Sequence, residues 1–89
     1  MTIERTTTIR NRLGLHARPA ADFVKVAAKF QSEISLGKDG VWVNGKSIMG
    51  VMTLAAEFGS TVTVRAEGED AKNAIEALAH CLSREYVEQ

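Results

Sequence analysis

The chain has 89 residues, of which 45% are hydrophobic and 25% are charged, so it is long enough to bury one core and too short to bury two. Its formal net charge is zero, so no overall field would gather nucleic acid or anionic lipid. The single cysteine, Cys81, excludes an internal disulfide, and no apolar stretch has the length of a membrane span. We therefore expect a single cytoplasmic domain over residues 1–89, with no nucleic-acid partner and no membrane insertion.

The first third of the chain predicts a strand, a short loop and a helix. β-Branched residues dominate residues 2–9, which is typical of a strand, and Gly14 gives the following loop a flexible point. From Ala17 to Phe30 the apolar residues recur at helical spacing. Pro19 falls in the first turn of this helix, where its missing N–H does no harm. We therefore expect an amphipathic helix that begins at or just after His16.

The middle of the chain predicts a hairpin and a short helix. Two strand-like runs, residues 32–36 and 41–43, flank the sequence Gly-Lys-Asp-Gly. Ser47 is a typical N-cap for a short helix that would end at Gly59. The pattern of residues 48–56 is also compatible with a strand, so that alternative stays open.

The last third predicts a half-buried strand and a second long helix. Apolar and polar residues alternate over residues 61–67, and Asp70 is placed to cap a helix with one apolar stripe. The stripe consists of Ala71, Ala74, Ile75, Leu78 and Leu82. The resulting βαββαβα order predicts an α+β fold in which three helices cover one face of a four-stranded, largely antiparallel sheet. The order of strands in the sheet does not follow from the pattern.

The segment around His16 concentrates the features of an anion-binding site. Gly14 lets the backbone turn, and His16 stands where the helix begins. The first N–H groups of a helix, here that of Ala17 onward, have no partner within the helix and carry the positive end of its dipole, so they bind phosphate oxygens. The Arg18 guanidinium can contact two such oxygens, and Pro19 preserves the geometry of the helix start.

Histidine suits a carrier that both accepts and releases a phosphoryl group. Neutral imidazole is a nucleophile near neutral pH and also a good leaving group, and phosphoryl transfer requires mainly positioning and charge neutralisation. His16 and Arg18 therefore predict a reversible phosphoryl site. On this segment alone, the alternative that His16 only caps a helix beside a solvated Arg18 stays open, because short motifs match by chance.

Ser47 is the second candidate. A phosphate at a helix N-terminus is tolerated, so modification could change the surface charge without unfolding the domain, although an ordinary N-cap serine is the alternative. Ile48, Met49 and Met52 follow, and at least one of them should be exposed, as in an adaptable docking surface. For Met52 the alternative is core packing.

The remaining chemistry-bearing residues do not indicate a site. We expect His80 on the solvated face of the last helix and Cys81 packed near its apolar stripe. One cysteine and two widely separated histidines predict no metal site. The sequence has no P-loop and no Rossmann glycine pattern, and it predicts neither a cofactor nor an independent enzyme. Trp42 is either a core residue or a lid on the open sheet face.

Two longer segments resemble one known family. Residues 14–20, Gly-Leu-His-Ala-Arg-Pro-Ala, are similar to the active-site signature of HPr, the histidine-containing phosphocarrier of the bacterial phosphoenolpyruvate-dependent sugar phosphotransferase system. Residues 45–52, Gly-Lys-Ser-Ile-Met-Gly-Val-Met, resemble the regulatory-serine signature of the same family. The resemblance extends over nearly the whole chain and implies an open-faced β-sandwich that carries a phosphoryl group without being an enzyme.

The resemblance also implies roles for individual residues. His16 would accept the phosphoryl group on Nδ1 from phosphorylated enzyme I and pass it to the A domains of enzymes II, for sugar uptake or its regulation. Ser47 would be phosphorylated by an ATP-dependent HPr kinase/phosphorylase, which would lower transfer through His16. Ile48, Met49 and Met52 would belong to the docking surface, and we expect a monomer.

Two alternatives remain. Leu13 departs from the family pattern, because many members carry a small polar residue there that bonds to the loop, and the departure leaves open a nitrogen-related paralogue. More broadly, the chain could be mainly a regulatory paralogue, nitrogen-related or in carbon-catabolite signalling, that acts through protein binding with phospho-Ser47 as the signal. A ferredoxin-like RNA-binding module is disfavoured, because the sequence lacks the interleaved aromatic and basic residues on which RNA bases stack.

Overall fold

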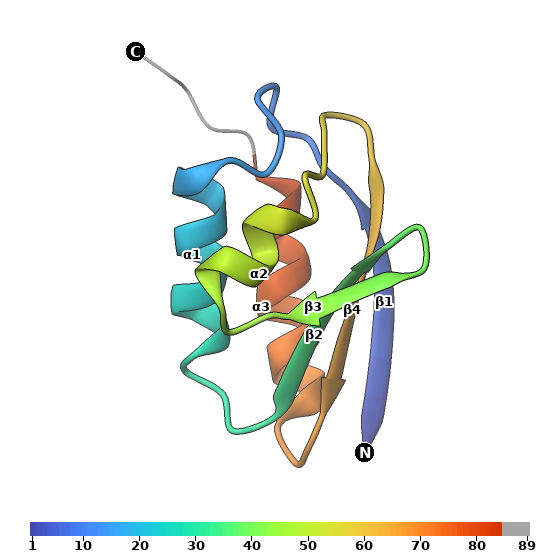
Figure 1. Ribbon diagram of the computed structural model, residues 1–89. Helices are drawn as coiled ribbons and strands as arrows, with labels where there is room; N and C mark the ends of the chain where they lie inside the picture. Colours follow the sequence, from blue (N-terminus) through green and yellow to red (C-terminus); the bar gives the residue numbers. More distant parts are fainter. Residues whose placement is uncertain (85–89) are drawn as a thin grey trace.

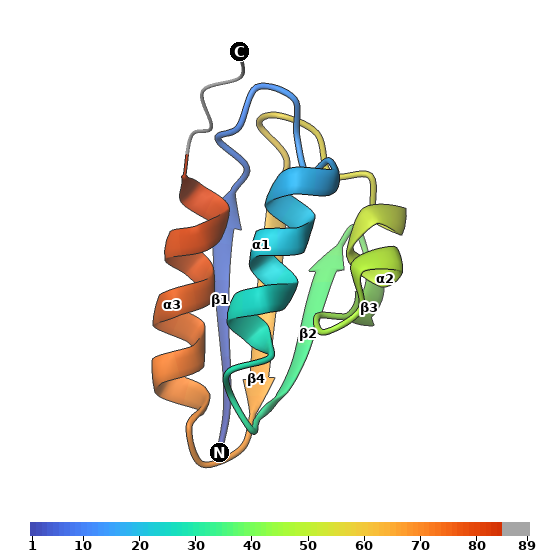
Figure 2. The same ribbon diagram turned by 90° about the vertical axis from the view of Figure 1, so that its left-hand side faces the viewer.

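The computed structural model of the chain describes residues 1–84. Its elements follow the chain as β1 (Thr2–Thr8), α1 (Ala17–Ala27), β2 (Glu33–Lys38), β3 (Val41–Asn44), α2 (Ile48–Thr53), β4 (Thr61–Glu67) and α3 (Ala71–Ser83). The strands form one sheet, and the helices lie on one of its faces (Figures 1 and 2). The predicted α+β class, βαββαβα order and open-faced arrangement are confirmed.

The sheet has the strand order β1-β4-β2-β3, and each neighbouring pair is antiparallel. β4 therefore lies inside the sheet, with Val64 opposite Arg5 of β1 and Leu36 of β2. β3 is an edge strand joined to β2 by the predicted hairpin, and Asp39 and Gly40 at its tip have φ values of 52° and 83°. Two residues with positive φ make a turn whose twist matches that of the strands it joins.

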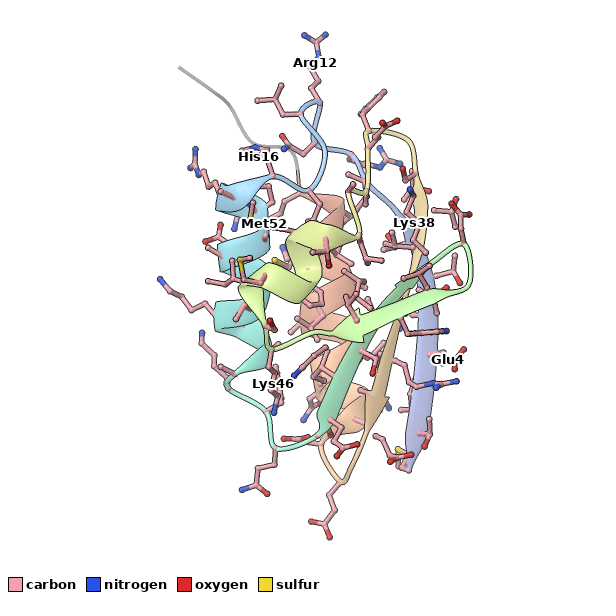
Figure 3. All side chains as sticks on the ribbon, viewed as in Figure 1. Glu4, Arg12, His16, Lys38, Lys46 and Met52 are labelled. Carbon is pink, nitrogen blue, oxygen red and sulfur yellow. The ribbon has the colours of Figure 1, made fainter. Side chains whose placement is uncertain are left out.

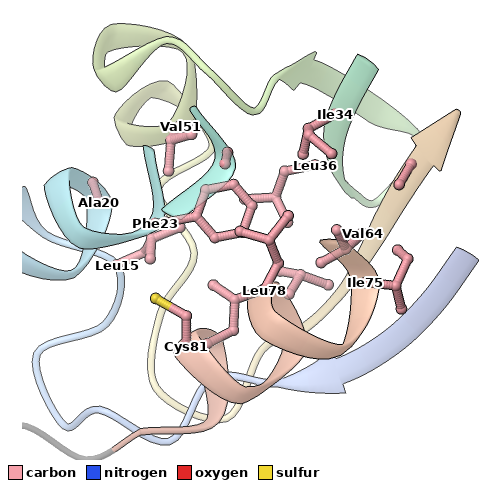
Figure 4. Packing of buried hydrophobic residues seen from close by; sticks show 14 of the residues in the cluster. Leu15, Ala20, Phe23, Ile34, Leu36, Val51, Val64, Ile75, Leu78 and Cys81 are labelled. Atoms are coloured by element: carbon pink, nitrogen blue, oxygen red, sulfur yellow. The ribbon is translucent and has the colours of Figure 1, made fainter. Parts of the chain in front are cut away.

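The core lies between the sheet and the helices α1 and α3 (Figure 4). Val62, Val64 and Ala66 of β4 are buried and alternate with more exposed residues, as the sequence predicts. Phe23 of α1 and Leu78 of α3 are fully buried in the same cluster. Burying a side chain of this size contributes about 1.5–3 kcal/mol, so the cluster fixes the position of α1 and of the loop that precedes it.

α1 begins where the sequence predicts but ends at Ala27 rather than at Phe30. The N–H groups of Lys29 and Phe30 donate to the carbonyl groups of Val26 and Ala27, at 3.1 and 3.2 Å. Each of these bonds spans three residues, which is a tightened turn and not a continued α-helix. β2 accordingly begins one residue later than predicted.

α2 is a helix, as favoured by the Ser47 cap, but it is shorter than expected. It ends at Thr53, because Ala55 takes a left-handed φ of 50° and turns the chain away before Gly59, the predicted end. Within the helix only Val51 is buried. Ala55, which follows the helix, is exposed.

α3 carries the predicted apolar stripe, which is buried. Burial, together with the nearby charge of Asp22, raises the pKa of the Cys81 thiol in this stripe. Asp70 occupies the predicted N-cap position, but its carboxylate makes no cap hydrogen bond and accepts instead from the N–H groups of Gln31 and Ser32, at 2.8 and 3.0 Å. No helix within residues 1–84 is both long and apolar enough to cross a bilayer.

Candidate functional site

His16 stands at the N-cap of α1, the helix position that the sequence predicts. Its backbone is extended, with φ −84° and ψ −169°, and its carbonyl oxygen accepts the first helical hydrogen bond from Ala20 N at 2.9 Å. The residue as a whole is half-buried, whereas its Nε2 atom is buried. The exposed surface of the residue therefore lies away from Nε2, and the ring reaches the surface at the end of the helix (Figure 3).

The backbone donors of the first turn lie directly after His16. The N–H groups of Ala17 and Arg18 precede the bond from Ala20 N that starts the helical series, and Pro19 has no N–H. Pro19 is buried in the first turn, as predicted, and Arg18 is exposed. The positive end of the helix dipole and a permanent cation are therefore next to the imidazole in the chain, which is the charge arrangement that an anion requires.

The loop before His16 is held against a second loop that lies far away in the sequence. Leu15 N donates to Ala56 O at 2.8 Å. Gly14 has a φ of 73°, and a Cβ atom there would lie 2.6 Å from Ala56 O. Because only glycine tolerates both the left-handed conformation and this close approach, the contact fixes how the chain enters α1. Figures 1 and 2 show the two loops side by side at one end of the sheet.

Asn11 is a structural part of this loop that the sequence reading missed. Its side chain is buried, with 3% exposed, and Nδ2 donates to Gly14 O at 2.9 Å. Gly14 N in turn donates to Asn11 O, so the segment 11–14 is closed by both backbone and side chain. Asparagine at the first position of a four-residue turn was the available signal. Leu13, by contrast, points into solvent with 63% of its surface exposed.

Ser47 is the N-cap of α2, and its hydroxyl oxygen accepts from Gly50 N at 3.1 Å. The predicted cap is confirmed. Ile48, Met49 and Met52 are exposed at 45%, 74% and 40%, so the core alternative for Met52 is wrong. The helix is short, and Val51 within it and Leu54 directly after it pack into the core.

α2 packs beside α1, so this apolar surface and His16 share one side of the molecule. The two helices are in contact, and Figure 3 places Met52 on the same side as His16. The structure thus places His16 and the predicted docking residue Met52 on one side of the molecule. His80 is exposed in the last turn of α3, as predicted. Within residues 1–84 there is no group of three or more side chains with the character of metal ligands.

Comparison with known proteins identifies the family. Residues 3–84 match the family model described as PTS HPr component phosphorylation site. The phosphocarrier protein HPr of Cupriavidus necator is 44% identical over 86 residues, which is 97% of each chain. The crystal structure of a phosphocarrier protein HPr from Bacillus anthracis is similar with a TM-score of 0.88 and 45% identity, over 92% of this chain and 98% of that one.

A regulatory relative has a similar structure as well. Crh, the catabolite-repression protein of Bacillus subtilis, was solved as a swapped dimer, and it matches with a TM-score of 0.77 and 45% identity over 97% of this chain and 99% of that one. Together with the family match, these likenesses define the class of this protein. The chain belongs to the HPr family of the phosphotransferase system, and HPr is a phosphocarrier protein and not a catalytic enzyme.

Proposed function

We propose that the chain acts as a single phosphocarrier domain, in which His16 accepts a phosphoryl group from phosphorylated enzyme I and passes it to the A domains of enzymes II. The observation that carries the proposal is the place of His16 at the N-cap of α1, half-buried, directly before the first-turn N–H groups. Partner proteins reach this end of the helix because it lies at the surface, and the protein works in the cytoplasm, where enzyme I acts.

The acceptor atom in this proposal is Nδ1. Nε2 is buried, which supports the other ring nitrogen as the acceptor. The lone pair of Nδ1 forms a P–N bond while the donor's bond to phosphorus breaks, and the reverse exchange releases the group to the acceptor. The Ala17 N–H, the helix dipole and the Arg18 guanidinium would then neutralise the phosphoryl oxygens, and the buried Pro19 would keep the first turn in place.

The labelling experiment uses phosphoenolpyruvate and enzyme I. We expect a mass increase of one phosphoryl group that is lost in acid, as a P–N bond requires, and no labelling of His16→Ala. Arg18→Ala should slow the transfer while leaving the site usable, because the helix N-terminus remains. Equal labelling of the His16→Ala protein would overturn the assignment.

We further propose that Ser47 is a regulatory site for an HPr kinase/phosphorylase. Its position at the N-cap of α2 supports this role, because added negative charge at a helix N-terminus is tolerated. The charge would lie among Ile48, Met49 and Met52, which we propose as docking residues, and would hinder partners there. Incubation with the kinase and ATP should give an acid-stable adduct on the parent protein and none on Ser47→Ala.

The likeness to Crh favours one second candidate, a mainly regulatory paralogue that acts through protein binding. In that case phospho-Ser47 would be the principal form, and transfer through His16 would be secondary. The rate at which enzyme I labels His16 distinguishes the two candidates. A rate useful for transport favours the carrier, and a much slower rate favours the regulatory paralogue. A monomer is our proposal for the carrier, and light scattering over a range of concentrations tests it against the swapped dimer described for Crh.

A further inference from the structure

Two large apolar side chains stand in solvent on the loops beside His16. Leu13 is 63% exposed and Phe58 is 62% exposed. Together with Arg12, Glu57 and His16 they line a shallow depression of about 470 Å³. Leu13 and Phe58 do not pack into the core. Exposed apolar side chains of this size are typical of a surface that binds another molecule.

Each of the two side chains projects from a turn that hydrogen bonds hold rigid. Leu13 is the third residue of the turn 11–14, which is closed by the bond from Gly14 N and by the buried Asn11 amide. Phe58 lies in the turn 57–60, where Ser60 N donates to Glu57 O at 2.9 Å and Glu57 N donates to Ser60 Oγ at 2.9 Å. Gly59, with a φ of 85°, donates to Ile9 O and ties this second turn to the end of β1. A turn whose backbone is already fixed loses little further backbone entropy when a partner covers it.

The two turns are also tied to each other. The bond from Leu15 N to Ala56 O and the packing of Gly14 on Ala56 join their bases. Their apolar tips therefore form one fixed surface, which we call the turn-tip surface and define by Leu13 and Phe58. It borders the His16 depression on the loop side, whereas α2 with Met52 lies on the other side, as Figure 3 shows for Arg12, His16 and Met52.

The charges around the turn-tip surface are mostly positive. Arg10 is exposed and lines a second hollow together with Phe58. Arg12 is exposed beside Leu13, and Figure 3 shows it projecting away from the body of the molecule, while Glu57 is the acidic residue in the lining. A partner that covers this surface would need an apolar side chain for Leu13 and Phe58 and carboxylates for the two arginines. Such complementarity contributes to the rate of encounter and to the choice of partner.

We propose that the turn-tip surface is a second docking surface, which recognises a phosphoryl-exchanging partner protein whose site is rimmed by an apolar side chain and carboxylates. The inference rests on the proposed function and deepens it: His16 lies between this surface and the α2 surface. Contact on both sides of the imidazole orients the partner's reacting group along one direction, which a single apolar surface would not do.

The test measures labelling of His16 by enzyme I and phosphoenolpyruvate at varied carrier concentration. The variant Leu13→Ser/Phe58→Ser should raise the KM for the carrier about tenfold while leaving kcat within about twofold, since a few large side chains carry most of the affinity of an interface. The control is Val41→Ser, which removes a 58% exposed apolar side chain from the remote hairpin and should change neither value. Arg12→Ser should raise KM and flatten its salt dependence.

Each outcome decides something. An unchanged KM in the double variant, with native circular dichroism, overturns the inference and leaves the proposed function intact. Absence of labelling in the parent protein overturns the proposed function and this inference with it. Should the double variant fold poorly, the amide spectrum of the parent titrated with enzyme I replaces it, and unshifted signals at residues 12–14 and 57–59 overturn the inference. A concentration-dependent dimer that the double variant abolishes would assign the surface to a second copy instead.

Discussion

The indole of Trp42 lies against the backbone of Gly37 on the neighbouring strand. A Cβ atom at Gly37 would come within 2.8 Å of the ring atoms Cδ2 and Cε3. The Arg65 guanidinium lies 4.8 Å from the ring centroid and also binds Glu4, with Nη2 2.6 Å from Oε2. Trp42 is therefore a lid on the open face of the sheet, and its contacts connect β3 to β2, β4 and, through Glu4, β1.

Gly37→Ala should destabilise the protein, because the added methyl group occupies the space of the indole ring. We expect a loss of about 1–3 kcal/mol, as for other overpacked sites, measured by urea unfolding followed by circular dichroism. In a Trp42→Ala background the same change should cost less than about 0.5 kcal/mol, because no ring is left to displace. An equal loss of stability with and without Trp42 would show that the contact between Gly37 and the indole ring does not cause the effect.

Asp70 should make the protein sensitive to acid. Its hydrogen bonds from the Ser32 hydroxyl and the Gln31 N–H lower the pKa of its carboxyl group below the ordinary value of 3.8. The unfolded chain therefore binds the proton first, so this stabilisation is full above the ordinary pKa and is lost as the pH falls below it toward the folded value. Stability measured between pH 6 and pH 2 should fall less steeply for Asp70→Asn than for the parent. The same pH dependence of stability in Asp70→Asn and the parent protein would show that Asp70 does not cause the acid sensitivity.

Gly14→Ala should disturb the entry to α1. The substitution combines a left-handed φ of 73° with a contact of 2.6 Å to Ala56 O, so the loop before His16 must shift. We expect a loss of about 2 kcal/mol or more and slower labelling of His16 by enzyme I. Gly40→Ala is a matched control, because its φ is 83° and no atom lies within 4 Å of the added Cβ. The control should lose about 1 kcal/mol of unfolding free energy, and His16 should be labelled at the normal rate. A normal labelling rate in both variants would show that the conformation of the loop before His16 does not affect phosphoryl transfer.

Ser47→Ala should remove the cap of α2 at a cost of about 1 kcal/mol, because the Gly50 N–H loses its acceptor. Ser47→Asp keeps an acceptor at the N-cap and should be nearly as stable as the parent. Its charge should nevertheless slow labelling of His16, since it lies at the start of the proposed docking helix. Thermal unfolding and the labelling rate, measured on both variants, distinguish the two effects. A fast Ser47→Asp carrier would contradict the regulatory role.

The sequence by itself determined the elements of the fold and the place of His16 and Ser47 at the starts of their helices. Alternation over residues 61–67 and helical spacing after Ala17 depend only on which side chains are apolar, and a helix start or an N-cap such as Ser47 depends on neighbours a few residues away. Such features depend only on residues that are close together in the sequence. His16 at the start of α1 is one of them.

Only the tertiary structure decided which distant segments meet. The sheet order, the contact of Gly14 with Ala56 and the exposure of Met52 depend on packing between residues far apart in the chain. Asp70 illustrates the reason: a carboxylate at an N-cap can serve its own helix, but here donors brought close by the fold, at Gln31 and Ser32, compete for it and win. A periodic pattern states that a side chain is apolar or polar, whereas its partner is set by the three-dimensional arrangement of the whole chain.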